Sequence, residues 1–245
     1  MGNKLKSLAE FQAVLTHYRL SGQSKQILAQ SKLVLLVAPS AGGRNTIIQE
    51  LLTTGDYYFV VSDTTRQPRV NNGVLERNGR EYWFRTEEEM LQDLKQGKFL
   101  EAEIIHGQQV SGISIRELQK ASNNNKIAIT DVDIGGISNI VEAKPDTIAI
   151  AVLPPSFAEW QQRLSVRGPI EVGEYKRRMQ TACRIFEQAV SHSKFAFVIN
   201  DNLQHAVEQI DHIAKKGMTD IKKHNQARQL ARKLLQETQA AISNL

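Results

Sequence analysis

The chain has 245 residues, of which 41% are hydrophobic and 23% are charged, so its composition is that of an average globular protein able to bury a full core. Its longest apolar runs, 33–37 and 148–153, are far too short to cross a bilayer, and we expect no transmembrane helix. The formal net charge of +5 lies in residues 214–245, where seven Lys or Arg residues stand against two acidic ones.

The first residues carry no recognisable targeting signal. Met1 to Ser7 lack the continuous apolar stretch of a signal peptide, and Lys6 stands where an N-myristoylation motif requires Ser or Thr. The single cysteine, Cys183, has no partner for an internal disulfide, and its helical surroundings favour a small core residue. We therefore expect a cytoplasmic protein.

Residues 1–30 are expected to form an N-terminal helical extension, because Leu8, Phe11, Leu15 and Tyr18 recur at helical spacing. From 31 to 213, short β-rich runs alternate with helical patterns, which predicts an α/β domain with a parallel sheet covered by helices on both faces. The clearest strands are 33–37, 127–130, 147–153 and 196–199. Their near-continuous apolar character suits strands that are buried on both faces.

Residues 56–112 have a different pattern, with aromatic and β-branched pieces, turns at Asn72 and Asn78, and a short acidic helix over 86–97. This pattern predicts a lobe inserted into the α/β domain. A further helix is expected at 174–192, where Met179 and Phe186 lie on one face.

The tail, 214–245, is predicted to be a basic helix with apolar residues at Ile221, Leu230, Leu234 and Ile242. Its lysines and arginines could contact RNA or an anionic membrane. The alternative is a solvated helix that packs on the domain or on a second subunit. We favour packing, because the tail has no aromatic residues to stack on bases. We expect no membrane partner and disfavour a nucleic-acid partner, which the basic tail leaves open, and oligomerisation through the terminal helices also stays open.

A candidate phosphate loop lies between the strand at 33–37 and a helix expected from about residue 47. In the GxxxxGK[ST] pattern, glycines let backbone N–H groups surround phosphates, the lysine reaches the outer phosphates and the last hydroxyl binds magnesium. The candidate phosphate-binding residues here are Ala38, Ser40, Gly42, Gly43, Arg44, Asn45 and Thr46. An ordinary tight strand-to-helix connection is the alternative interpretation.

Three of these residues differ from the pattern. Ala38 replaces the first glycine, Arg44 the lysine and Asn45 the magnesium-binding Ser or Thr, while Gly43 keeps the second glycine. Arg44 preserves the positive charge on a bulkier planar fork. The amide oxygen of Asn45 is a workable but weaker ligand for a hard cation.

A second basic motif follows at Ser62–Arg69, where Arg66 and Arg69 are three residues apart around Pro68. Two guanidinium forks at this spacing can clamp a phosphate dianion. A solvated basic loop is the alternative for an isolated pair of this kind.

Several ordered motifs of the chain resemble those of the guanylate kinase family. Ser62–Arg69 matches the family's SxTTRxPR motif at every fixed position, Tyr82 and Phe84 match a Tyr-x-Phe, and 99–101 match an FLE segment before His106-Gly107. Further likenesses follow at 131–136, 154–156, 163–168 and 200–201. The resemblance covers about 31–213 and implies a P-loop NTPase-type parallel sheet with an inserted GMP-binding lobe, about 56–112, and a helical lid, about 163–180.

The resemblance also implies an acceptor site. Arg66, Arg69 and Tyr82 would hold the GMP phosphate, while Ser40, Glu101 and Asp133 would face the guanine. Two departures concern this lobe: the family's second tyrosine is missing from 108–112, and twelve residues separate Arg69 from Tyr82, a longer loop than usual.

The implied reaction transfers a phosphoryl group from ATP to GMP with Mg²⁺. The catalytic arginines would be Arg44, Arg163, Arg167 and Arg178, with Arg177 as the neighbouring alternative to Arg178. Asn45 and, through water, Asp131 would organise the metal. Without the motif pattern, Arg163, Arg167 and Arg178 would be interpreted as solvated residues of two amphipathic helices. The competing hypothesis, motivated by the altered loop, is an inactive relative that binds GMP or a protein partner.

Overall fold

The computed structural model describes residues 4–71, 73–132, 134–166, 168, 170–217 and 220–244. The chain forms two compact units, which are described separately below. The first comprises Met1–Leu33, Tyr58–Ala128 and Ser138–Asp146, and the second comprises Val34–Tyr57, Ile129–Ile137 and Thr147–Leu245. Asp133 and Arg167, both predicted site residues, lie outside the described residues.

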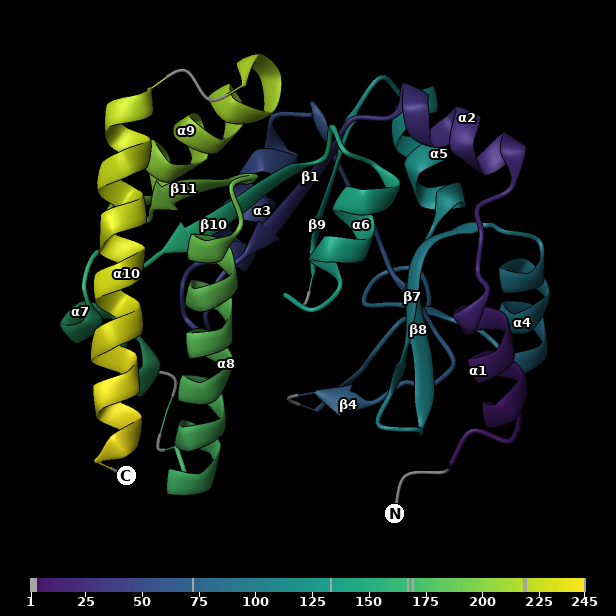
Figure 1. The fold of residues 1–245 in the computed structure, drawn as a ribbon, viewed down its shortest axis with the longest axis horizontal. Coiled ribbons are helices and arrows are strands. Elements are labelled where there is room, and N and C mark those ends of the chain that lie inside the picture. The colour runs from purple at the N-terminus through teal and green to yellow at the C-terminus, as the bar shows by residue number, and fades with distance from the viewer. Residues whose placement is uncertain are drawn as a thin grey trace. The chain divides into compact units, whose positions relative to one another are not determined.

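A five-stranded sheet has the order β11-β10-β1-β9-β2 (Figure 1), and all of β10 and β11 with most of β1 and β9 belongs to the second unit. Its strands are β1 Leu33–Val37, β2 Tyr57–Phe59, β9 Ile127–Asp131, β10 Ile148–Leu153 and β11 Phe195–Ile199. The pairs β1–β10 and β10–β11 are parallel, and all five residues of β1 are buried. These features confirm the predicted α/β class with a parallel sheet.

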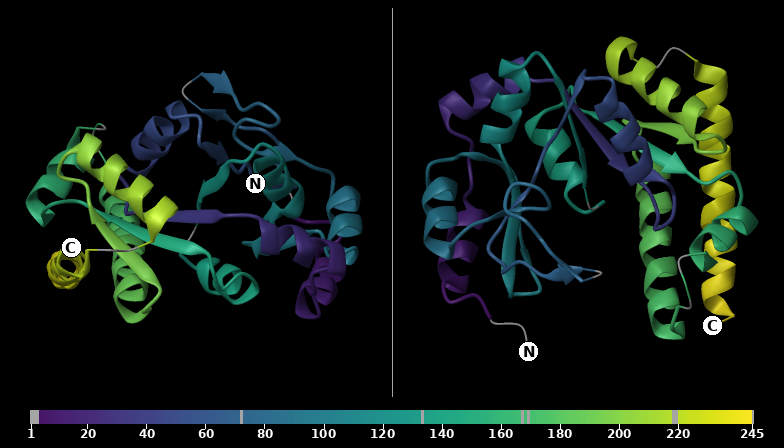
Figure 2. Two further views of the ribbon diagram at one scale, coloured as in Figure 1. Left: turned by 90° about the horizontal axis from the view of Figure 1, so that it is seen from above. Right: turned by 180° about the vertical axis from the view of Figure 1, so that it is seen from behind.

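Helices flank this sheet. They are α3 Arg44–Thr53, α7 Phe157–Ser165, α8 Val172–Ser191, α9 Leu203–Lys216 and α10 Ile221–Ser243. Figure 2 (left) shows α3 and α9 on one side of the strands and α8 and α10 on the other. The long helix α10 packs along α8 and buries Ala227, Ala231 and Leu234. Ile221 is 67% exposed, so it does not pack on its own unit as the first of the two predicted alternatives requires.

The first unit contains a four-stranded sheet in the order β6-β3-β8-β7 and a separate β4-β5 hairpin. The strands are β3 Asp63–Thr64, β4 Val70–Asn71, β5 Val74–Leu75, β6 Trp83–Phe84, β7 Phe99–Ile105 and β8 Gln109–Ser114. The helices of this unit are α1 Leu8–Thr16, α2 Gly22–Gln30, α4 Glu87–Lys95, α5 Ile115–Asn123 and α6 Ile137–Ala143. The helix α1 lies against α4 and β7 (Figure 1), and Phe11, Met90 and Phe99 form the core there.

Hydrogen bonds fix the start of α4 and the chain between α1 and α2. Helix α4 is fixed by a capping box, in which the Thr86 hydroxyl accepts from the Glu89 N–H at 3.2 Å and the Glu89 carboxylate accepts from the Thr86 N–H at 2.9 Å. The predicted N-terminal helix is two helices, α1 and α2, and Tyr18 lies between them. Its hydroxyl donates to the Phe99 carbonyl at 2.6 Å and accepts from the Phe99 N–H at 2.7 Å.

Among the residues described, no helix has both the length and the apolar character that a membrane span requires. Cys183 is half-buried in α8, and burial raises the pKa of its thiol.

Candidate functional site

The candidate phosphate loop lies in the second unit, between β1 and α3. Gly43 has φ +94°, a left-handed conformation that suits glycine, and α3 begins directly after it at Arg44 rather than at about residue 47. A side chain at Gly42 would place its Cβ 2.9 Å from Ala38 Cβ and from the Pro39 carbonyl. Both glycines are therefore required by the loop's own geometry, even though the loop has lost its first glycine.

Two side chains from distant parts of the second unit support this loop. The Asn200 amide donates to the Gly42 carbonyl at 2.9 Å, and a Cβ at Gly43 would lie 2.0 Å from the Asn200 amide nitrogen. The Trp160 indole, which is fully buried, donates to the Ser40 carbonyl at 2.7 Å. We did not predict either support from the sequence, because each depends on where α7 and the end of β11 lie in the fold.

Arg44, at the lysine position of the phosphate-loop pattern, is paired with a carboxylate. Its Nη2 lies 2.6 Å from Asp131 Oδ2, and the two side chains are 26% and 35% exposed. The Arg44 Nε also donates to Asn45 Oδ1 at 3.4 Å. The structure thus brings together three predicted site residues, and an anionic ligand at Arg44 would compete with Asp131.

Two of the predicted catalytic arginines lie on α7 and α8 of the same unit. Arg163 donates to Glu159 at 2.6 Å and to the Asn200 carbonyl at 2.9 Å, which links α7 to the residue that supports the phosphate loop. The Arg178 Nε donates to Glu174 at 2.9 Å, and Arg177 pairs with the same carboxylate. Both candidate arginines of α8 therefore contact Glu174.

Two polar residues of the SxTTRxPR segment, Asp63 and Thr64, hold this segment of the first unit in place. Asp63 is fully buried and accepts from Arg85 at 3.0 Å and from Arg116 at 3.1 Å. The Thr64 hydroxyl accepts from Ser111 at 2.8 Å. These contacts with β8 and its surroundings fix the strand from which Arg66 emerges.

Arg66 and Tyr82 lie together, as the motif pattern predicts. The Arg66 guanidinium carbon lies 4.6 Å from the Tyr82 ring centroid and 5.5 Å from that of Phe84. The same guanidinium donates to both carboxylate oxygens of Glu76, at 2.5 and 2.9 Å. Arg69 has an exposed side chain, while its backbone N–H donates to Glu76 at 2.8 Å. Glu76 was missed in the sequence analysis.

Glu101 lies on β7 in the same unit, and its Oε2 is buried with no hydrogen-bond partner among the described residues. Burial, with a smaller contribution from the nearby Glu103, raises the pKa of Glu101 to about 8. A buried carboxyl group without a donor is costly in a folded protein, so it points to a ligand that supplies the missing N–H groups.

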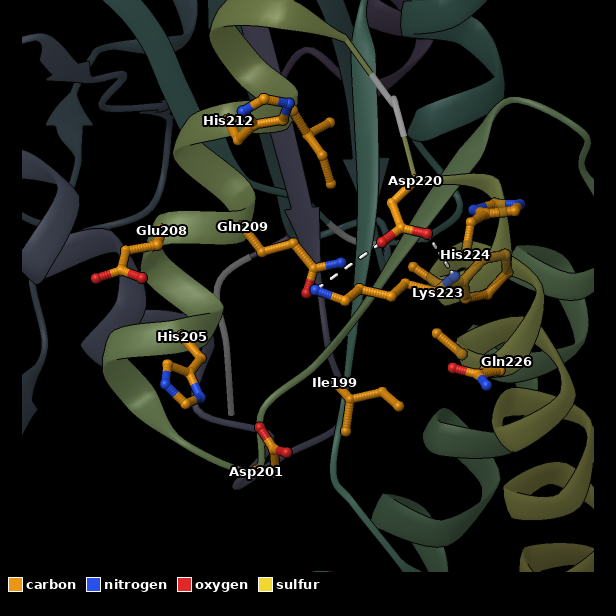
Figure 3. A pocket seen from close by; sticks show the side chains of 13 residues that line it. Ile199, Asp201, His205, Glu208, Gln209, His212, Asp220, Lys223, His224 and Gln226 are labelled. Carbon is orange, nitrogen blue, oxygen red and sulfur yellow. Dashed lines mark hydrogen bonds and ion pairs between the residues drawn. The ribbon is translucent and has the colours of Figure 1, made fainter.

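A separate pocket of about 610 Å³ lies beside α9, α10 and β11, in the second unit (Figure 3). Its polar lining carries both signs of charge, and Lys223 pairs with Asp220 at 3.9 Å within it. None of the predicted site residues lines this pocket, so it is distinct from the phosphate loop.

Comparisons with known proteins agree with the motif pattern. A family model described as guanylate kinase matches residues 30–237. The chain is 34% identical over 193 residues to a guanylate kinase of Corynebacterium jeikeium, covering 78% of this chain and 99% of that protein. It is also 34% identical over 183 residues to one of Porphyromonas gingivalis, covering 74% and 94%. The crystal structure of guanylate kinase from Anaplasma phagocytophilum matches with a TM-score of 0.54 over 78% of this chain and 87% of that chain, and at 21% identity it supports the fold.

Proposed function

Because the chain belongs to the guanylate kinase family, we propose that it transfers the γ-phosphoryl group of ATP to GMP, giving ADP and GDP. The observation that carries this proposal is the buried Oε2 of Glu101, which has no hydrogen-bond partner among the described residues and lies in the same unit as the Arg66–Tyr82 pair. A guanine base offers the donors that Glu101 lacks, and a monophosphate offers the anion that arginines bind.

Guanine and adenine present different hydrogen-bonding groups to a carboxylate. An ionised Glu101 can accept from guanine N1–H and from the exocyclic amine, whereas adenine presents an acceptor at N1. With AMP bound, the Glu101 carboxylate would face adenine N1, which is also an acceptor, and neither group would gain a hydrogen bond. The site therefore rejects AMP. Ser40 and Asp133 are proposed to face the guanine as well, on the family pattern alone.

The acceptor phosphate is assigned to Arg66, Arg69 and Tyr82. Arg66 is partly buried and oriented by its contacts with Glu76 and Tyr82, which supports a rigid binding group, while the exposed Arg69 side chain would close on the ligand. Two guanidinium groups neutralise a phosphate dianion and give directional, paired hydrogen bonds.

On the donor side, phosphoryl transfer needs positioning and charge neutralisation more than a general base. Backbone N–H groups of the loop from Ala38 to Thr46 would surround the ATP phosphates. Arg44 would exchange Asp131 for a phosphate oxygen, and Arg163, Arg167 and Arg178 would neutralise charge on the transferred group.

Magnesium is proposed to enter with ATP. The side-chain oxygens of Asn45 and Asp131 are of the hard type that Mg²⁺ prefers. Their contacts with Arg44 place both residues at the phosphate loop, where a metal could also bind the nucleotide phosphates. Bound there, the metal would neutralise charge on the phosphates. Asp131 would hold it through water once Arg44 has moved to the nucleotide.

A coupled ADP-release assay with purified protein, ATP, Mg²⁺ and GMP tests the proposal, beside AMP and no-acceptor controls. We expect ADP release that depends on GMP and is at least a hundredfold slower with AMP, because a site that pairs buried polar groups discriminates strongly. Silence at high protein concentration, with GMP binding still detectable by calorimetry, would instead make the chain a non-catalytic GMP-binding relative.

A further inference from the structure

Glu76, which directly follows β5 in the first unit, is a buried carboxylate with an unusual number of donors around it. It accepts from Arg66 Nη1 at 2.5 Å, from Arg66 Nη2 at 2.9 Å, from the Arg69 N–H at 2.8 Å and from the Asn71 amide at 3.2 Å. The hydrogen bonds from Arg66 are the main cause that lowers the pKa of Glu76 to about 2. The carboxylate is therefore ionised at every pH at which the protein would be studied.

These contacts engage the N–H groups on one edge of the Arg66 guanidinium and leave another edge for a ligand. Of its five N–H groups, two on Nη1 donate to Gln67 O and Glu76, and one on Nη2 donates to Glu76. The hydrogen bonds to Gln67 and Glu76 do not use the Nε–H or the second Nη2–H, which point from the same edge, while the Tyr82 side chain also interacts with the guanidinium. That edge is a fork that matches two oxygens of a phosphate.

Glu76 also closes the loop between Arg69 and Tyr82, which is longer than the corresponding loop of the family pattern. Its N–H donates to the Arg69 carbonyl at 2.9 Å while its carboxylate accepts from the Arg69 N–H, so the two residues are joined in both directions across the base of the β4-β5 hairpin. The extra residues are thereby confined to the hairpin, and Arg66 and Tyr82 stay in contact.

We propose that Glu76 is a positioning residue for the acceptor phosphate, orienting Arg66 so that its Nε and Nη2 edge receives the phosphate of the nucleoside monophosphate. This inference rests on the proposed function. Removing the negative charge would by itself strengthen the attraction of Arg66 for phosphate. Positioning outweighs that gain, because the Arg66 side chain is only 10% exposed and would lose the group that fixes its rotation.

The test is Glu76→Gln, with binding of GMP and of guanosine measured by calorimetry. Because hydrogen bonds to charged groups are strong, we expect about tenfold weaker GMP binding, with guanosine binding changed less than twofold. In turnover assays, KM for GMP should rise about tenfold while kcat changes less. Glu76→Asp keeps the charge and should recover part of the GMP affinity.

Asp93→Asn is the matched control, since Asp93 pairs with Arg85 at 3.0 Å in the same unit and touches no residue assigned to the ligand. It should leave the ratio of GMP to guanosine affinity within twofold of wild type. The ratio for Glu76→Gln should also be the same at pH 6 and pH 9 relative to wild type, because Glu76 does not titrate there.

Three results would overturn the inference. They are equal losses for GMP and guanosine, which would mean a damaged lobe; tighter GMP binding, which would mean that charge dominates; and no change at all. If Glu76→Gln fails to fold, the same comparison is made with Glu76→Asp. A wild-type protein that binds no GMP would overturn the proposed function as well, whereas an active wild type with an unaffected variant would overturn only the role of Glu76.

Discussion

At the scale of single residues, Glu101 gives the chain a pH dependence with a definite sign. Its pKa is raised to about 8 in the free protein, so at pH 7 most molecules carry a neutral carboxyl group. The proposed contact with guanine uses the ionised form, so GMP binding must release a proton below pH 8. GMP affinity should therefore rise by up to about tenfold per pH unit toward pH 8 and then level off.

Calorimetry between pH 6 and 9, in buffers of different ionisation enthalpy, measures both the affinity and the released proton. Glu101→Gln has no proton to release, and its weaker GMP affinity should be flat across the same range. A wild-type affinity that is also flat, with no proton release at pH 7, would show that Glu101 does not read guanine as a carboxylate.

Asp131 gives a second prediction at this scale, because it holds Arg44 at 2.6 Å. Asp131→Asn should free Arg44 for phosphate and remove a nearby negative charge. A partly exposed ion pair is worth at most about 1 kcal/mol, so ATP binding without magnesium should tighten about two- to fivefold. Turnover with magnesium should fall, because the proposed metal ligand is lost. Weaker metal-free ATP binding in the variant would contradict the competition between Asp131 and phosphate.

At the scale of elements, the phosphate loop depends strictly on two glycines, Gly42 and Gly43, of which only Gly43 belongs to the sequence pattern. Gly43→Ala would require a side chain at φ +94° and a Cβ 2.0 Å from the Asn200 amide nitrogen, which holds the Gly42 carbonyl. We expect the strain to displace Asn200 and to weaken ATP binding by about tenfold or more, with GMP binding unchanged.

Gly22→Ala is the control for this change, since an added Cβ at Gly22, in α2, meets no atom within 4 Å. Both variants can be compared by calorimetric titration with ATP and with GMP. Equal ATP affinity in Gly43→Ala and wild type would mean that the loop adapts and that Asn200 is not a necessary support.

The same loop shows which elements the sequence can predict. The strand, the loop and the following helix were predictable because apolar runs and glycines act locally. The start of α3 was placed about three residues too late, because the left-handed Gly43 ends the loop without a polar N-cap side chain. Trp160 and Asn200 could not be inferred, since their hydrogen bonds depend on the packing of α7 and β11 rather than on neighbours in sequence.

The first unit also separates residues that sequence motifs can predict from residues that depend on the folded structure. Arg66, Tyr82 and Glu101 were predicted because they stand in an ordered series of motifs, and the structure brings Arg66 and Tyr82 into contact. Glu76 was missed because its contacts with Arg66 and Arg69 form only once the β4-β5 hairpin has closed. One physical signal was available: an arginine expected to be partly buried needs a carboxylate, and a search for that partner within the lobe would have included Glu76.

At the scale of the whole molecule, the basic tail lies beyond the ordered motifs, although the guanylate kinase family model extends to residue 237. The packing of the tail limits its role. Helix α10 buries Ala227, Ala231, Leu234 and Thr238 within the second unit, against α8 and β11. Its lysines and Arg232 are exposed, whereas the half-buried Arg228 donates to the Val190 carbonyl of α8 at 2.7 Å. This arrangement favours the hypothesis that the tail stabilises the sheet and helices of that unit.

Leu234→Ala tests this role, because Leu234 is fully buried. Deleting a buried leucine side chain costs about 2–5 kcal/mol, and in a chain of this size the melting temperature should fall by at least about 4 °C. Ile221→Ala, in the same helix at a 67% exposed position, should change the free energy of unfolding by less than about 0.5 kcal/mol. Denaturant unfolding of both variants measures the difference. If the two costs were equally small, α10 would contribute little to the stability of its unit, and its basic face would become the more important feature of the tail.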